Sequence, residues 1–175
     1  ISKPFTYQKL ARNRASGIIQ ELMFPDKVFL ASKSPRRLEL LSFCFQNVQQ
    51  IQSLREEPKW DHDEKAIDYL KRCIEVKALG AEEAYVLQEK NSKNHSENHL
   101  LVAADTIVML KGEIFGKPDS PKDAEKMLQK MMGHQHSVLT AFSVVLYQSG
   151  KKAKEETKVL ETKVRFRKAS LSEIK

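Results

Sequence analysis

The segment from Val28 to Leu41 constrains the fold of this chain more than any other. It opens with an apolar run that is long enough for one buried strand, and small hydroxyl residues and a proline follow it. A helical apolar face then begins at Leu38. Ser34 stands where a helix N-cap would lie and Pro35 occupies the first helical position, which proline favours. The segment therefore predicts a strand, a tight loop and the start of a helix.

The same loop carries groups that suit a bound phosphate. A helix N-terminus offers unpaired backbone N–H groups and a partial positive charge. Ser32 and Ser34 add hydroxyl groups, and Arg36 and Arg37 add guanidinium forks that bind phosphate oxygens in pairs, as lysine cannot. No glycine-rich fingerprint accompanies them. From this segment alone, a capped helix with solvated arginines stays an alternative.

Apolar periodicity predicts the remaining elements. Strands and helices alternate in the first part of the chain and hairpins follow, so the fold class is α/β with a mixed β-sheet. The cysteines Cys44 and Cys73 are expected to be reduced core residues. The expected helices lie over about 8–23, from 64 to about 88 with Asp61 or Asp63 as the cap, and after Ser120 as the cap. The expected strands are 47–53, 100–104, which ends on Asp105, 136–147, and the half-exposed strand 159–167, with a further extended stretch over 107–110. A surface loop is expected over 89–99, and turns are expected at 111–112 and 149–152.

A second motif lies near the middle of the chain. It consists of Ala104-Asp105-Thr106-Ile107-Val108, followed by Gly112-Glu113-Ile114-Phe115-Gly116-Lys117-Pro118. Together with the run from Leu30 to Leu41, it resembles the two signature segments of the Maf family of nucleoside triphosphate pyrophosphatases. The resemblance implies an elongated, two-lobed α/β fold with a central cleft, like that of inosine-triphosphatase-like enzymes.

The resemblance also divides the chain. It covers residues 28–175, so residues 1–27 are expected to be an N-terminal extension. In the family, a further segment beyond Ile174 helps to recognise the base. We therefore expect the C-terminal part of the domain to be missing from this sequence.

The resemblance assigns functional roles to residues whose residue type and position alone are also compatible with structural or solvated roles. It implies that Asp105 is the general base, although an aspartate there can also cap a turn. It places Glu57 where the family has an acidic ligand of metal or water, with Glu56 as the neighbour that is not excluded and a solvated loop residue as the alternative. Glu57 and Asp105 each follow a predicted strand, and if these strands are neighbours in one sheet we expect the two carboxylates to share a metal ion. Lys77 and Lys117 are expected to bind substrate, although solvated lysines are the alternative at both positions.

The implied reaction is the hydrolysis of a nucleoside triphosphate to the monophosphate and pyrophosphate, with Mg²⁺ or Mn²⁺ as cofactor. Such a reaction needs cations for the triphosphate, carboxylates for the metal and a base for the attacking water. Arg36 and the substrate-binding residue Thr106 match the subgroup that resembles dTTP/UTP pyrophosphatases, whereas the 7-methyl-GTP subgroup tends to carry tryptophan and glutamine there. The alternative is a catalytically weak, nucleotide-binding regulator linked to cell division.

Charge and composition bound the partners. The net charge is +7, but the basic residues are scattered, so a nucleic-acid partner is not expected. No apolar run is long enough to span a membrane, and no signal peptide is visible. The two cysteines form no metal-binding motif and fit a reducing cytoplasm. A homodimer is compatible with the sequence, which does not determine the oligomeric state.

Overall fold

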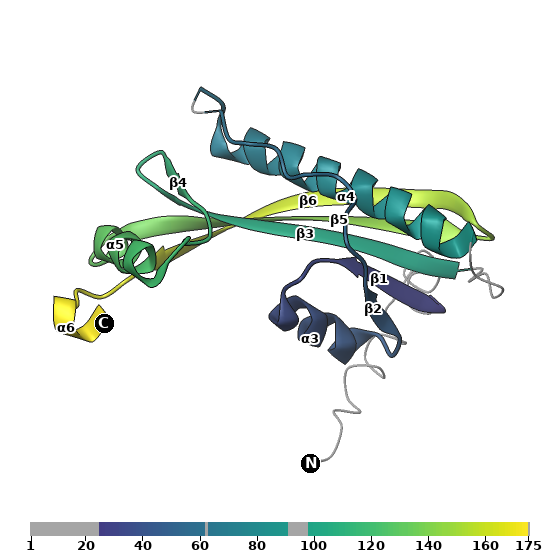
Figure 1. The fold of residues 1–175 in the computed structure, drawn as a ribbon, viewed down its shortest axis with the longest axis horizontal. Helices are drawn as coiled ribbons and strands as arrows, with labels where there is room; N and C mark the ends of the chain where they lie inside the picture. Colours follow the sequence, from purple (N-terminus) through teal and green to yellow (C-terminus); the bar gives the residue numbers. More distant parts are fainter. Residues whose placement is uncertain (1–24, 62, 91–97, 175) are drawn as a thin grey trace, which may run out of the picture.

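The computed structural model describes residues 25–61, 63–90 and 98–174 (Figure 1). The helix expected over about 8–23 lies outside the described residues. The elements in chain order are β1 (Lys27–Ala31), α3 (Pro35–Cys44), β2 (Val48–Gln50), α4 (Ala66–Lys90), β3 (Asn98–Leu110), β4 (Glu113–Phe115), α5 (Pro121–Met131), β5 (Gln135–Gln148), β6 (Lys151–Arg165) and α6 (Leu171–Ile174). No helix in this part of the chain is long and apolar enough to cross a membrane.

The strands form a single mixed sheet in the order β2-β1-β3-β5-β6, with β4 also paired to β3. β1 runs parallel to both β2 and β3, whereas β3, β5 and β6 pair antiparallel. The predicted α/β class with a mixed sheet is therefore confirmed. The sheet is elongated, with β1, β2 and α3 toward one end and β4, α5 and α6 at the other (Figure 1).

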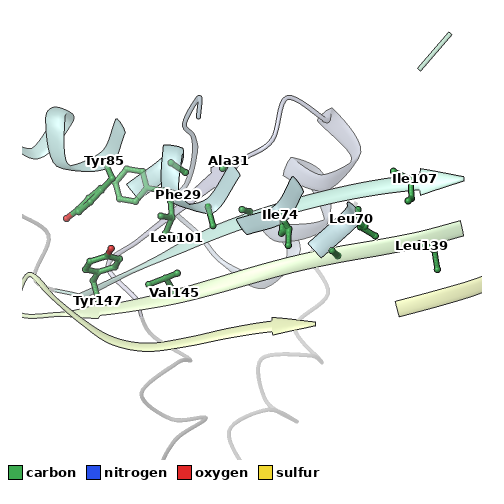
Figure 2. Close-up of a cluster of buried hydrophobic side chains, with 14 residues drawn as sticks. Phe29, Ala31, Leu70, Ile74, Tyr85, Leu101, Ile107, Leu139, Val145 and Tyr147 are labelled. Atoms are coloured by element: carbon green, nitrogen blue, oxygen red, sulfur yellow. The ribbon is translucent and has the colours of Figure 1, made fainter. Parts of the chain in front are cut away.

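Each face of the sheet has its own core. In β1, alternate side chains point to opposite faces, so Phe29 and Ala31 pack with α4 whereas Val28 and Leu30 face α3. Figure 2 shows Phe29 and Leu101 in the α4 cluster, together with the aromatic rings of that core. Burial of a large apolar side chain stabilises a fold by roughly 1.5–3 kcal/mol. The two helices are thereby fixed on opposite faces of one strand.

One edge of β3 has a break in its pairing. β1 pairs with β3 as far as Ala103, and β4 pairs with it from Val108 onward. Among the described residues, no strand lies along that edge from Ala104 to Ile107. The opposite edge is paired with β5 throughout this stretch. The break lies between the two ends of β3.

The prediction that the strand ends at Asp105 is therefore wrong. Asp105 lies within β3 because β5 continues the ladder, with Asp105 opposite Ala141. The first of the two hairpin turns that follow was predicted correctly, and the second is shorter than predicted, because β6 begins at Lys151 rather than at Val159. Lys111 and Gly112 have φ angles of 51° and 84°, and Ser149 and Gly150 have φ angles of 48° and 72°, as tight hairpin turns require.

Several local predictions were also wrong. α4 begins at Ala66, and the backbone N–H of Tyr69 bonds to the carbonyl of Lys65, so neither Asp61 nor Asp63 caps it. Cys44 is exposed, because α3 turns that side away from the sheet, whereas Cys73 is buried as expected. The surface loop expected over 89–99 lies largely outside the described residues, but His99 belongs to β3. It is fully buried and stacks on Tyr147, with ring centroids 4.6 Å apart.

Candidate active site at the break in strand pairing

Asp105 and Thr106 lie in the break and reach opposite faces of the sheet. Successive side chains of a strand alternate between faces. Asp105 therefore meets α4, where the ammonium of Lys77 lies 3.4 Å from its Oδ1 atom. Thr106 meets the α3 side, where its Oγ1 atom accepts a hydrogen bond of 2.7 Å from Arg37. The break therefore connects groups that two different helices supply.

The guanidinium of Arg37 takes the place of a neighbouring strand. Its Nη1 atom donates to the carbonyl oxygen of Ala104 at 2.8 Å and to Oγ of Ser32 at 3.1 Å. The backbone N–H of Thr106 donates to Oδ1 of Asp105 at 3.0 Å. Buried or partly buried backbone groups need such partners when no strand is present. Arg37 thus fixes the loop after β1 to the middle of β3.

Lys77 joins two carboxylates on the other face. Its Nζ atom lies 2.6 Å from Oε1 of Glu57, in addition to its contact with Asp105. The Lys77 side chain is only 13% exposed, against 60% for that of Glu57. The hydrogen bond from Lys77 is the main cause that lowers the pKa of Glu57, and the positive charges of Lys77, Lys117 and Arg37 act in the same direction. Glu57 is therefore a carboxylate in a basic environment.

A close approach between α4 and the loop after β2 positions Glu57. A side chain on Gly80 would lie 2.2 Å from Oγ of Ser53 and 2.7 Å from the backbone nitrogen of Arg55, so only glycine fits there. The backbone N–H of Leu54 donates to the carbonyl of Gly80 at 3.1 Å. Arg55 also bonds Glu83, at 2.6 Å. These contacts hold the loop on the α4 side of the sheet, where Glu57 meets Lys77.

The structure brings most of the predicted site residues together. Arg37 contacts both Ser32 and Thr106, and Lys77 contacts both Glu57 and Asp105. The remaining three predicted binding residues lie at the periphery. Ser34 is the N-cap of α3, and its backbone N–H donates to Oγ of Ser32 at 3.2 Å. Lys117 is exposed in the segment after β4, with its charge within range of Glu57; Arg36 is exposed and forms no hydrogen bond or ion pair with the described residues.

Two positioning residues escaped the sequence reasoning. Thr140 of β5 lies opposite Thr106, and their hydroxyl oxygens are 3.1 Å apart. Gly80 lies inside a helix, where its sequence context indicates only a lower helix propensity. A glycine inside a long amphipathic helix is a signal of close packing, but the partner of Thr106 depends on the β3–β5 register, which no local motif encodes.

The carboxylates of the site supply only some of the ligands that a hard divalent cation needs. Among the described residues, no group of three or more histidine, cysteine, aspartate or glutamate side chains is arranged to hold a metal. Glu57 and Asp105 nevertheless offer carboxylate oxygens on either side of one ammonium cation. Mg²⁺ is usually held by one or two carboxylates together with substrate phosphates and water. The pair therefore suits a metal that arrives with a phosphorylated substrate.

Comparison with protein families places the chain. The family model described as Maf-like protein matches residues 27–175. The chain belongs to the Maf family. Curated relatives agree: a Shewanella denitrificans protein named dTTP/UTP pyrophosphatase is 32% identical over 145 residues, which cover 83% of this chain and 69% of that protein. A protein of the same name from Geobacter sp. strain M21 is 37% identical over 118 residues, which cover 67% of this chain and 54% of that protein.

Comparison with solved structures finds a more distant similarity. The Staphylococcus aureus Ham1 protein matches with a TM-score of 0.42 and 18% sequence identity, over 79% of this chain and 69% of that one. The matches to the two curated Maf relatives span 69% and 54% of their lengths.

Proposed function

We propose that this Maf protein hydrolyses a nucleoside triphosphate to the monophosphate and pyrophosphate, with dTTP and UTP as the favoured substrates. The observation that carries the proposal is the convergence of Glu57, Lys77 and Asp105 at the break in β3. This group lies beside residues 32–37, which we call the arginine loop because they include Arg36 and Arg37. The names of the curated relatives and the match of Arg36 and Thr106 to their subgroup support the same reaction.

Each group has a task in that reaction. Asp105 accepts a proton from the water whose oxygen attacks the α-phosphorus, and pyrophosphate leaves as the bond to the bridging oxygen breaks. Lys77, Lys117 and Arg36 bind the triphosphate oxygens. Ser32 and Ser34 bind them at the N-terminus of α3, where unpaired N–H groups favour anions.

Glu57 and Asp105 are the proposed ligands of a divalent cation, Mg²⁺ or Mn²⁺. When bound, the metal supplies positive charge that offsets the charge on the phosphoryl oxygens. Arg37 and Thr106 hold the arginine loop and β3 in register, so that the phosphate-binding face and the carboxylate face keep a fixed separation. The free thiols of Cys44 and Cys73 support our placement of the enzyme in a reducing cytoplasm.

A panel of nucleoside triphosphates tests the proposal. Purified protein is incubated with each common nucleotide and Mg²⁺ or Mn²⁺, and pyrophosphate release is measured with and without a chelator. We expect pyrophosphate from dTTP and UTP in preference to the purine nucleotides, and loss of activity on chelation that either metal restores. Release of inorganic phosphate in place of pyrophosphate would contradict attack at the α-phosphorus. Binding of nucleotides without turnover would favour the alternative function, a nucleotide-binding regulator that is catalytically weak.

A further inference from the structure

Lys77 occupies the space between the two carboxylates that we assign to the metal. Its ammonium is within 2.6 Å of Glu57 and 3.4 Å of Asp105, so one cation serves both carboxylates. The side chain emerges from α4 next to Ala78, which belongs to the buried core. With 13% of its surface exposed, Lys77 is much less solvated than the glutamate that it contacts.

We propose that Lys77 competes with the divalent cation for Glu57 and Asp105 and so couples metal binding to nucleotide binding. This inference rests on the proposed function, because it concerns the metal of that same site. A compact ammonium and a hard divalent cation seek the same carboxylate oxygens. Lys77 must therefore leave the pair, or share it, before both carboxylates can bind a metal.

The displaced ammonium needs a new partner. A mostly buried cation that loses its carboxylates is strongly destabilised unless another anion replaces them. A triphosphate supplies oxygens next to the arginine loop, within the field of the same basic residues that lower the pKa of Glu57. Nucleotide thus stabilises the displaced position of Lys77, and by thermodynamic linkage each ligand strengthens binding of the other.

A lysine that serves only as a phosphate contact behaves differently. Its removal would weaken nucleotide binding and would change metal binding by the free protein only through the general loss of one positive charge. Lys117 provides that reference, because its charge reaches Glu57 although the lysine is exposed. Comparison of Lys77→Met with Lys117→Met therefore separates direct competition from long-range electrostatics.

The experiment measures Mn²⁺ binding to the nucleotide-free protein by electron paramagnetic resonance of the unbound ion. We expect Lys77→Met to bind Mn²⁺ about tenfold more tightly than wild type, a change of about 1.4 kcal/mol. We expect Lys117→Met to change the affinity much less. Equal effects of the two substitutions, or unchanged binding in Lys77→Met, would overturn the competition.

A second variant guards against misfolding. Circular dichroism and thermal unfolding are recorded first for each protein. If Lys77→Met does not fold, Lys77→Arg keeps the charge and presents a fork that binds carboxylates in pairs. Lys77→Arg should then bind Mn²⁺ more weakly than wild type, and tighter binding would overturn the inference.

The result also separates this inference from the proposed function. Metal-dependent turnover by the wild type, combined with equal Mn²⁺ affinities of wild type and Lys77→Met, would overturn the competition between Lys77 and the metal. It would leave the proposed pyrophosphatase activity unaffected. Turnover that survives chelation, with no Mn²⁺ binding by any variant, would overturn the metal role and the competition together.

Discussion

Asp105 accepts a hydrogen bond of 3.0 Å from the backbone N–H of Thr106, its neighbour in β3. That N–H lies in the stretch where β3 lacks a strand on one side among the described residues, so the carboxylate replaces a backbone partner. The bond fixes the orientation of the carboxyl group in the strand. A residue of the same shape that cannot take up a proton therefore separates the structural role of Asp105 from its proposed catalytic one.

Asp105→Asn should keep the fold and lower turnover by about 10²-fold or more, as expected when a positioned base is lost. The amide oxygen of asparagine can still accept the bond from Thr106. Pyrophosphate release and circular dichroism check the two parts of this expectation. Asp63→Asn makes the same chemical change in an exposed turn and serves as the control. Wild-type turnover in Asp105→Asn would exclude it as the base.

Glu57→Gln should raise the metal concentration needed for half-maximal rate more than it raises the KM for nucleotide. Glutamine keeps the size of the side chain but is a much weaker ligand for Mg²⁺ than a carboxylate. Parallel titrations of Mg²⁺ and nucleotide give both values. Glu56→Gln is the matched control, since Glu56 is the exposed neighbour in the same loop. If only the Glu56 variant shifts the metal titration, the ligand assignment moves to Glu56.

Arg36 and Arg37 should respond differently to replacement by lysine. Arg37 contacts Ala104 and Ser32 through one guanidinium nitrogen and Thr106 through the other, whereas lysine has a single side-chain nitrogen. Arg37→Lys should therefore behave like Arg37→Ala. Arg36 has no such contacts among the described residues, and Arg36→Lys should restore part of the binding that Arg36→Ala loses.

Steady-state kinetics and thermal unfolding distinguish the structural role of Arg37 from the substrate-binding role of Arg36. Charged hydrogen bonds contribute roughly 1.5–3 kcal/mol each, and we expect Arg37→Lys to lower the melting temperature as well as kcat. Full rescue of Arg37 by lysine would show that a point charge suffices at that position. Unchanged nucleotide binding in both alanine variants would mean that neither arginine contributes to substrate binding.

Gly80→Ala should destabilise the protein and weaken its metal response. The added methyl group would meet Ser53 and the backbone of Arg55, which must shift together with the loop that carries Glu57. Overpacking of this kind costs about 1–3 kcal/mol. Gly116→Ala is the control, because nothing lies within 4 Å of its added methyl group. Denaturant unfolding gives the free energies, and equal stability of the two variants would contradict the close approach.

The ion pair of Arg55 and Glu83 should stabilise the site loop only above acidic pH. The hydrogen bond from Arg55 lowers the pKa of Glu83 from its ordinary value of 4.5. A group whose pKa is lowered by folding contributes stability above its unfolded pKa and loses it as the pH falls through the folded pKa.

Glu83→Gln should therefore melt below wild type at neutral pH, and the difference should shrink as the pH falls below about 4.5. Thermal unfolding over a pH series checks this. Glu75→Gln, exposed on the same helix, should show no such convergence. A difference that persists at low pH would mean that glutamate acts there through packing rather than charge.

Local sequence determined a large part of the fold. Pro35 starts α3 with Ser34 as the N-cap residue, although the Ser34 side chain forms no capping hydrogen bond. Ser120 caps α5 by accepting a bond of 3.1 Å from the backbone N–H of Asp123. These elements were predictable because their signals lie within one turn of the boundary. The two hairpin turns were predictable from short range as well, because Gly112 and Gly150 lie in the turns themselves and adopt positive φ angles.

Long-range packing determined what the sequence could not predict. Asp105 lies within a strand, because β5 pairs with it across the chain. Cys44 belongs to an apolar segment, yet α3 has no fully buried residue and exposes Phe43 beside it. Lys77 meets Glu57 on the loop that also packs closely against Gly80, and nothing in the local sequence specifies the partner of that glycine.

The strand β3 is supported unevenly along its length. Near its two ends it has a neighbour on each side, and from Ala104 to Ile107 only β5 lies beside it in the part of the chain that the structure describes. β3 is thus a central strand toward both of its ends and has one edge without a partner strand in the middle, among the described residues. From Ala104 to Ile107, the ladder hydrogen bonds of β3 in the described part of the chain are therefore formed with β5 alone. The placement of Asp105 and Thr106 therefore depends on β5 together with two side chains, Lys77 from α4 and Arg37 from α3.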